Sequence, residues 1–176
     1  MNKHALAVMA LLCLPPAAFA IGHGHGHVQI RGSIVDTACA IATGDLDQVI
    51  DMGTLPVAEL INDGRGPPVP FTVHLINCTL DGADTHAAHH WKDVRITFQG
   101  MPDGKKLFAV HGASSGEGVA IVDAAGMQAV PGEPMSATPI LPGEMALHYQ
   151  LQMEEDSHAI HPGRFTTALR FFMEYE

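Results

Sequence analysis

The last twelve residues of the chain, 165–176, constrain its fold most strongly. The apolar residues of this segment share the odd positions: Phe165, Leu169, Phe171, Met173 and Tyr175. Polar or charged residues take most even positions, and Phe172 is the one large apolar residue among them. A period of two residues places alternate side chains on opposite faces of a β-strand. We therefore predict one strand over residues 165–176, with an apolar face that has to be buried.

Several other segments have strand character. Residues 28–34, 94–98, 118–123 and 146–153 alternate apolar with polar, residues 71–78 read as a strand that carries the second cysteine, and residues 48–52 are a weaker candidate. Gly- and Pro-containing turns separate them, notably at 64–70, 101–104 and 125–126. Residues 57–61 are expected to form no more than one helical turn. Short strands separated by turns predict an all-β sandwich in a single domain.

The N-terminus has the pattern of a secretory signal peptide over residues 1–20. An apolar run at 5–14 precedes the small residues Ala18 and Ala20, which suit the −3 and −1 positions of a cleavage site. The run is too short for a membrane span. We therefore expect export of a mature chain that begins at Ile21.

Charge and cysteine content narrow the class further. The leader carries Lys3 and no acid, so 8 of the 9 Lys and Arg residues and all 19 Asp and Glu residues remain in the mature chain, a formal charge of −11. Such a protein repels phosphate backbones, so nucleic acid is not an expected partner. Cys39 and Cys78 are the mature cysteines. In an exported chain they predict a disulfide, which stabilises the fold by about 4 kcal/mol in the chain-entropy model.

Motifs at both ends resemble those of one protein family. Gly163 is the fourteenth residue from the end, an alternating apolar strand follows it, and the penultimate residue is the aromatic Tyr175. Residues 30–39 look like a first strand leading into the first cysteine, and residues 71–78, 94–100 and 115–126 follow in a matching order. In these features the chain resembles the pilins of chaperone–usher fimbriae, the type 1 and P-pilus subunits.

This resemblance implies an incomplete immunoglobulin-like β-sandwich that a donor strand from another subunit completes. Residues 21–35 would be the donor-strand extension and residues 36–176 the pilin domain. The donated side chains would be Val28, Ile30, Gly32 and Ile34. The C-terminal strand facing the groove or a chaperone would present Gly163, Phe165, Leu169, Phe171, Met173 and Tyr175. From pattern alone, both segments could instead be core strands of a complete sandwich.

The function implied is that of a structural or adaptor subunit of a fimbria that supports cell adhesion. Its partners would be other fimbrial subunits, a periplasmic chaperone and an outer-membrane usher, and it would pass through the periplasm to the cell surface. Shaft, tip-adaptor and terminating positions all stay open. No cofactor is expected.

Histidine clusters suggest a different function, a secreted or periplasmic metal-binding protein. Imidazoles bind zinc, copper and nickel, and the candidate ligands are His23, His25, His27, His86, His89 and His90. No cysteine or carboxylate is placed as an obvious fourth ligand. Eleven mature histidines could also make the polymer sensitive to pH, since imidazoles titrate near neutrality.

Enzyme functions are not expected. Gly112–Gly116 matches G-x-S-x-G, but that motif needs a strand, a sharp turn and a helix, and a valine-rich strand follows here. A dismutase-like metal site would need core histidines in His-x-His pairs. Only His74, His111 and His148 lie in or near expected strands, and none of them forms such a pair.

Overall fold

The computed structural model describes residues 26–82 and 90–176. The chain divides into two compact units, Met1–Ile34 and Val35–Glu176, and each is described by itself. The expected signal peptide lies outside the described residues. No helix in the described ranges is long and apolar enough to cross a membrane.

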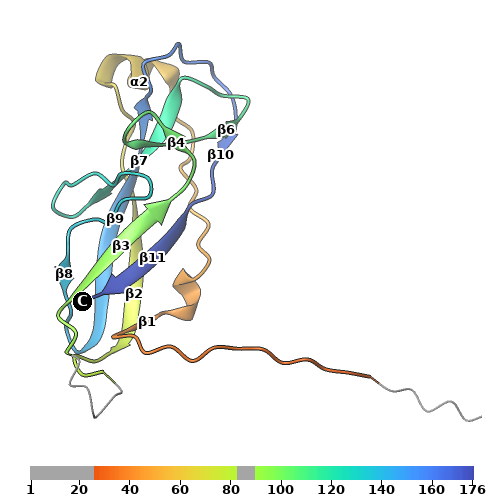
Figure 1. The fold of residues 1–176 in the computed structure, drawn as a ribbon. Helices are drawn as coiled ribbons and strands as arrows, with labels where there is room; N and C mark the ends of the chain where they lie inside the picture. The colour runs from red at the N-terminus through yellow and green to blue at the C-terminus, as the bar shows by residue number, and fades with distance from the viewer. Residues whose placement is uncertain (1–25, 83–89) are drawn as a thin grey trace, which may run out of the picture. The chain divides into compact units, whose positions relative to one another are not determined.

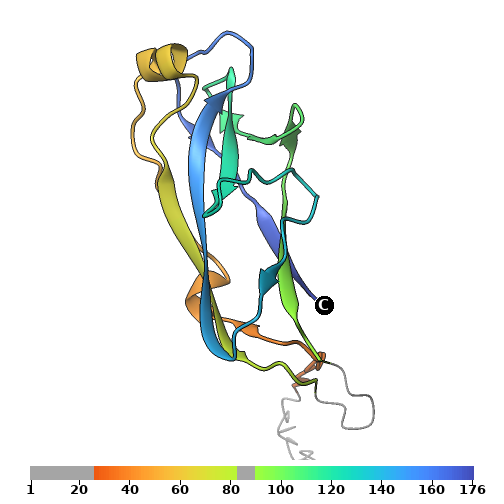
Figure 2. The same cartoon turned by 90° about the vertical axis from the view of Figure 1, so that its left-hand side faces the viewer.

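The second unit is built from two antiparallel β-sheets. The larger sheet has the strand order β1-β2-β9-β7-β5-β4 and the smaller one β11-β3-β8. The strands of the larger sheet are β1 (Ala40–Ile41), β2 (Val69–Cys78), β9 (Gly143–Glu155), β7 (Glu117–Asp123), β5 (Leu107–Ala109) and β4 (Pro102–Asp103). Those of the smaller sheet are β11 (Arg170–Tyr175), β3 (Asp93–Gln99) and β8 (Thr138–Pro139). A further pair joins β10 (Phe165–Thr166) to β6 (His111–Gly112). Figures 1 and 2 show the two layers, with β2 and β9 opposite β3 and β11.

The core lies between these layers because each strand turns its alternate apolar side chains inward. Val73 and Leu75 of β2 are completely buried, and Ile96 and Phe98 of β3 meet them from the other sheet. The remaining central strands contribute Val119, Ile121, Leu147, Tyr149, Leu151 and Met153. The expected all-β sandwich is therefore confirmed.

Most of the expected elements are present. Strands β2, β3, β7 and β9 contain the segments expected at 71–78, 94–98, 118–123 and 146–153. The single helical turn expected at 57–61 is a longer helix, α2 (Val57–Asp63), of about two turns, and a short 3-10 helix, η1, spans Thr43–Asp45. Gly64 ends α2 in the left-handed conformation (φ 71°), and its N–H donates to the Leu60 carbonyl at 2.8 Å. The turn expected at 101–104 instead holds β4, which forms a hairpin with β5.

Three expected strands differ from the structure. Residues 28–39 form no strand, and only β1 follows the first cysteine; residues 48–52 also form none. An extended segment without a neighbouring strand cannot form ladder hydrogen bonds. The C-terminal strand is split, because β10 pairs with β6 whereas β11 pairs with β3. Between them Thr167 Oγ1 donates to the Ala109 carbonyl at 2.8 Å. The alternation nevertheless persists, with odd residues partly buried and even residues exposed through 165–176.

The expected disulfide between Cys39 and Cys78 is confirmed. Both residues are buried, and the Thr79 N–H donates to the Ala38 carbonyl at 2.8 Å beside them. The Tyr175 hydroxyl donates to the Cys39 carbonyl at 3.2 Å. The disulfide therefore joins the entry of the chain into the domain to the end of β2, and the last strand packs against it.

Candidate functional site

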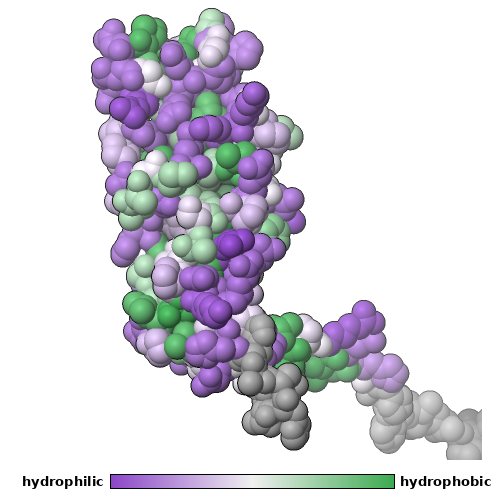
Figure 3. Space-filling view, turned by 60° about the vertical axis from the view of Figure 1, so that its left-hand side comes forward, coloured by the Kyte–Doolittle hydropathy of each residue, from purple (hydrophilic) through white to green (hydrophobic). Residues whose placement is uncertain are grey.

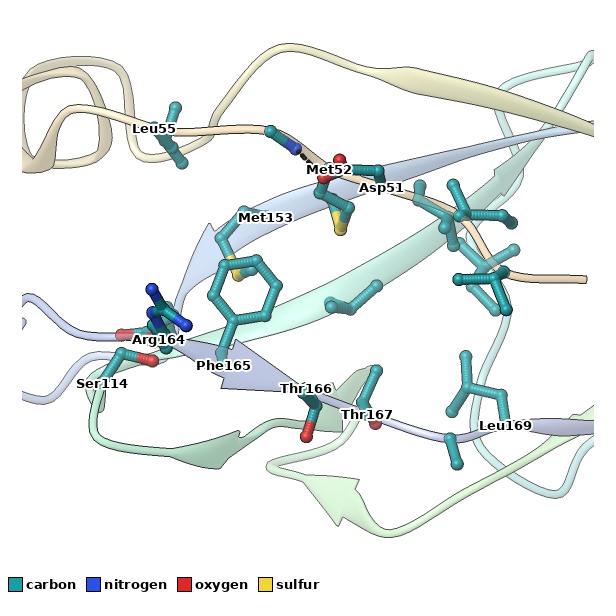
Figure 4. Close-up of a pocket in the computed structure, with 18 of the residues that line it drawn as sticks. Asp51, Met52, Leu55, Ser114, Met153, Arg164, Phe165, Thr166, Thr167 and Leu169 are labelled. Carbon is teal, nitrogen blue, oxygen red and sulfur yellow. Dashed lines mark hydrogen bonds between the residues drawn. The ribbon is translucent and has the colours of Figure 1, made fainter.

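An open groove of about 910 Å³ runs beside the C-terminal strand of the domain. One wall is the segment 46–57 and the other is the segment 160–171. The floor is mainly the apolar surface of the core, formed by Phe71, Phe98, Val119, Ile121, Leu151 and Met153. In Figure 4 the Phe165 ring points from its wall toward Met153 on the floor, with Met52 on the opposite wall. The groove thus opens directly onto the hydrophobic core.

The first wall is held to the domain by side chains. In the described parts of the chain, the backbone of residues 47–55 forms no hydrogen bond to another backbone group. Gln48 Nε2 donates to the Thr72 carbonyl at 2.9 Å, and at the head of the wall His74 Nδ1 lies 2.8 Å from an Asp45 oxygen. The backbone N–H of His74, with smaller contributions from its side chain, lowers the pKa of Asp45. The wall is extended and anchored, yet its backbone groups are available to a further strand.

The opposite wall is held by close backbone contacts that need glycine. A Cβ on Gly163 would lie 2.4 Å from the carbonyl carbon of Ala113, and one on Gly112 (φ 146°) would lie 2.1 Å from the Arg164 oxygen. The N–H of Ala113 donates to this same Arg164 oxygen at 2.9 Å. These contacts bring the loop after β6 against the segment that leads into Phe165. They fix one end of the groove.

The structure brings together part of the predicted C-terminal set. Gly163, Phe165, Leu169 and Phe171 line the groove. Met173 and Tyr175 do not line it but pack against the core farther along β11, where the Tyr175 ring lies 6.0 Å from that of Trp91. A role in binding a strand or a chaperone stays a prediction for all of them.

The predicted donor residues stand in the first unit. Val28, Ile30 and Ile34 are 88%, 90% and 103% exposed, and nothing lies within 4 Å of a Cβ built on Gly32. Figure 3 shows hydrophobic residues of this segment on its surface among hydrophilic ones. Their spacing of two residues would place these apolar side chains on one face of a strand. Their donation to another subunit stays a prediction.

Most candidate metal ligands cannot be placed. His23, His25, His86 and His89 lie outside the described residues. His27 is exposed, and His90 Nδ1 lies 3.2 Å from an Asp81 oxygen. Within residues 26–82 and 90–176, no group of three or more His, Cys, Asp or Glu side chains could hold a metal ion.

The G-x-S-x-G segment, Gly112–Gly116, runs from β6 into β7. It therefore joins two strands, which is not the context of a nucleophile elbow. Ser115 Oγ lies 3.3 Å from His161 Nδ1, and the His161 N–H donates to the Ser115 carbonyl at 2.8 Å. These bonds hold the loop against the second wall.

Sequence reasoning missed Glu117, which lines the groove and is 6% exposed. Glu117, Val119 and Ile121 stand at alternate positions of β7, so an acid occupies an inward position of an apolar face. Neither of its carboxylate oxygens has a hydrogen-bond partner among the described residues. The signal was available in the sequence, because the alternation of residues 118–123 extends back to this residue.

Comparisons with known proteins agree with this geometry. The model of the fimbrial protein family matches residues 28–176. The chain is 32% identical to the PRS fimbrial minor pilin protein of Escherichia coli over 86% of this chain and 77% of that one. It is 30% identical to the major MR/P fimbria protein of Proteus mirabilis, over 100% and 99%. A solved chaperone–usher pilus matches with a TM-score of 0.69 and 26% identity, over 89% of this chain and 98% of that one.

Proposed function

Because the chain belongs to the fimbrial protein family and is a subunit of the chaperone–usher type, we propose that it joins its neighbours in the fimbria by exchanging β-strands. The groove of its domain receives a strand from one neighbour. Its own N-terminal extension, residues 21–35, enters the groove of another. Residues 1–20 direct export and are removed, and residues 36–176 form the pilin domain.

The observation that carries this proposal is the open groove. An added strand would lie between wall 46–57 and wall 160–171, cover apolar floor residues such as Val119 and Ile121, and extend the sheet by main-chain hydrogen bonds. Each 100 Å² of apolar surface that the strand covers is worth about 2.5 kcal/mol, at about 25 cal/mol per Å², before the entropy of ordering the strand is subtracted. Such a gain would make the exchanged strand long-lived.

The extension supports the other half of the proposal. Val28, Ile30 and Ile34 alternate with polar residues and are exposed, so they are ready to enter apolar pockets without local unfolding. The chain divides into its two units at Ile34 and Val35, which agrees with an extension that ends near residue 35. Before assembly, a periplasmic chaperone would cover the groove and an outer-membrane usher would host the exchange. The assembled fimbria would support adhesion at the cell surface.

Peptide complementation tests the proposal. The mature chain, residues 21–176, is refolded alone, with a peptide of residues 26–36, or with a control peptide of equal composition in which each residue of 28–35 is exchanged with its neighbour. The control moves the apolar residues to the other face of the strand. We expect the native peptide to raise the urea midpoint and to suppress oligomers, and the control to do neither. A stable monomer that binds both peptides equally would contradict strand exchange.

A further inference from the structure

The groove contains one polar feature that an apolar strand would not satisfy. Glu117 begins β7, and Ser114 lies in the loop just before it. Both Glu117 carboxylate oxygens and Ser114 Oγ are buried and lack hydrogen-bond partners in the part of the chain that the structure describes. All three atoms belong to the end of the groove where the loop after β6 meets Arg164.

A buried polar group without a hydrogen-bond partner costs free energy, because it has given up its hydrogen bonds to water. The other charged or titratable residues lining the groove are Asp47, Asp51, His161 and Arg164. Arg164 is exposed, and no salt bridge joins it to Glu117 within the described ranges. An apolar side chain placed over Glu117 would seal this carboxylate from water. A side chain that carries a hydrogen-bond donor would satisfy it.

We propose that Glu117 determines which strand the groove accepts, selecting a donor strand whose inward side chain at this end bears a hydrogen-bond donor. This inference rests on the proposed function and deepens it. A charge-assisted hydrogen bond in a site sealed from water favours such a strand by roughly tenfold to a hundredfold over one with an apolar side chain of the same shape.

The chain's own extension does not match this requirement. Its apolar face presents Val28, Ile30, Gly32 and Ile34, and none of these side chains donates a hydrogen bond. Whichever end of the extension reaches Glu117, the carboxylate would meet an aliphatic side chain or a glycine. The preferred donor is therefore a different subunit, with a hydroxyl, amide or cationic residue at the matching position, and not a second copy of this chain.

Matched peptide pairs test the proposal on the mature chain. Valine and threonine have nearly the same shape, so each inward position of the 26–36 peptide that carries a side chain is made in both forms: Val28 with V28T, I30V with I30T, and I34V with I34T. Affinities are measured by fluorescence anisotropy for the wild type, for Glu117→Leu and for Glu117→Gln. Glu117→Leu removes the acceptor, whereas Glu117→Gln keeps the side-chain shape and an acceptor without the charge.

At one position near an end of the peptide, we expect the threonine form of the peptide to bind the wild-type protein about tenfold more tightly than the valine form. The preference should fall in Glu117→Gln and reverse in Glu117→Leu, while valine stays preferred at the other positions. Valine binding at least as tightly as threonine at every position of the wild type would overturn the proposal, whether or not the variants fold. Failure of every peptide to bind would instead contradict strand exchange itself.

Discussion

Replacing Gly163 with alanine should destabilise the domain and distort one end of the groove. The new Cβ would lie 2.4 Å from the carbonyl carbon of Ala113 and 2.5 Å from the nitrogen of Ser114. Both are backbone atoms, and the Ala113 N–H is bonded to the Arg164 oxygen, so no rotamer change relieves the contact. Separating the two segments costs about 1–3 kcal/mol, as overpacking does in protein cores.

The assay is urea unfolding of the mature chain bound to the peptide of residues 26–36, followed by fluorescence of Trp91, the one tryptophan of the sequence. A loss of about 2 kcal/mol with an m-value of about 2 kcal/mol per M lowers the midpoint by about 1 M. The peptide should also bind more weakly, because Gly163 and Phe165 line the same groove.

Gly44→Ala is the matched control, because nothing lies within 4 Å of a Cβ built on this exposed residue of η1. This change should leave stability unaltered or raise it by up to about 1 kcal/mol, since alanine reduces the entropy of the unfolded chain. Equal midpoints for Gly163→Ala and the wild type, with the control behaving as expected, would refute the steric reasoning.

The remaining predictions concern the disulfide, the C-terminal strand and pH. Replacing both cysteines with serine should lower the free energy of unfolding by about 4 kcal/mol. Reductant should lower the urea midpoint of the wild type and leave that of the double variant unchanged. Phe171→Ala should lower the free energy of unfolding by about 2 kcal/mol, because this ring is partly buried against the core. Phe172→Ser, on the exposed face, should change it by no more than about 0.5 kcal/mol. Equal losses would contradict the assigned faces. The lowered pKa of Asp45 means that its bond to His74 stabilises the fold above the ordinary value of 3.8 and that this contribution is lost as the pH falls through the lower, folded-state pKa. The stability difference between wild type and Asp45→Asn, measured by urea titration from pH 2 to 6, should therefore be constant above about pH 5 and shrink in acid.

The sequence predicted those parts of the fold that depend on local alternation. Strands β3 and β9 have one apolar face each, so their period of two was visible without knowledge of their partners. The division of residues 165–176 was not, because it depends on pairing first with β6 and then with β3. Pairing partners come from tertiary structure, which the pattern of a single segment does not contain.

The groove was predictable only in part. The side chains of Phe165, Leu169 and Phe171 follow from the alternation of the last strand. The wall at 46–57 was missed because single side-chain bonds, such as that of Gln48 to Thr72, hold it in place without strand pairing. A pattern search for apolar faces also passes over an acid such as Glu117.

Under the proposed strand exchange, in which a subunit is pulled by its extension, the disulfide would have a mechanical consequence. Tension that enters at Val35 reaches Cys39 after four residues, and there a covalent bond carries load directly to Cys78. The segment between the two cysteines, which includes the groove wall at 46–57, is fixed at both ends to the point where the force arrives. While the disulfide is intact, a pulling force therefore cannot detach this wall from the domain starting at its N-terminal side. After reduction, the segment between the two cysteines would carry the force and would be free to extend.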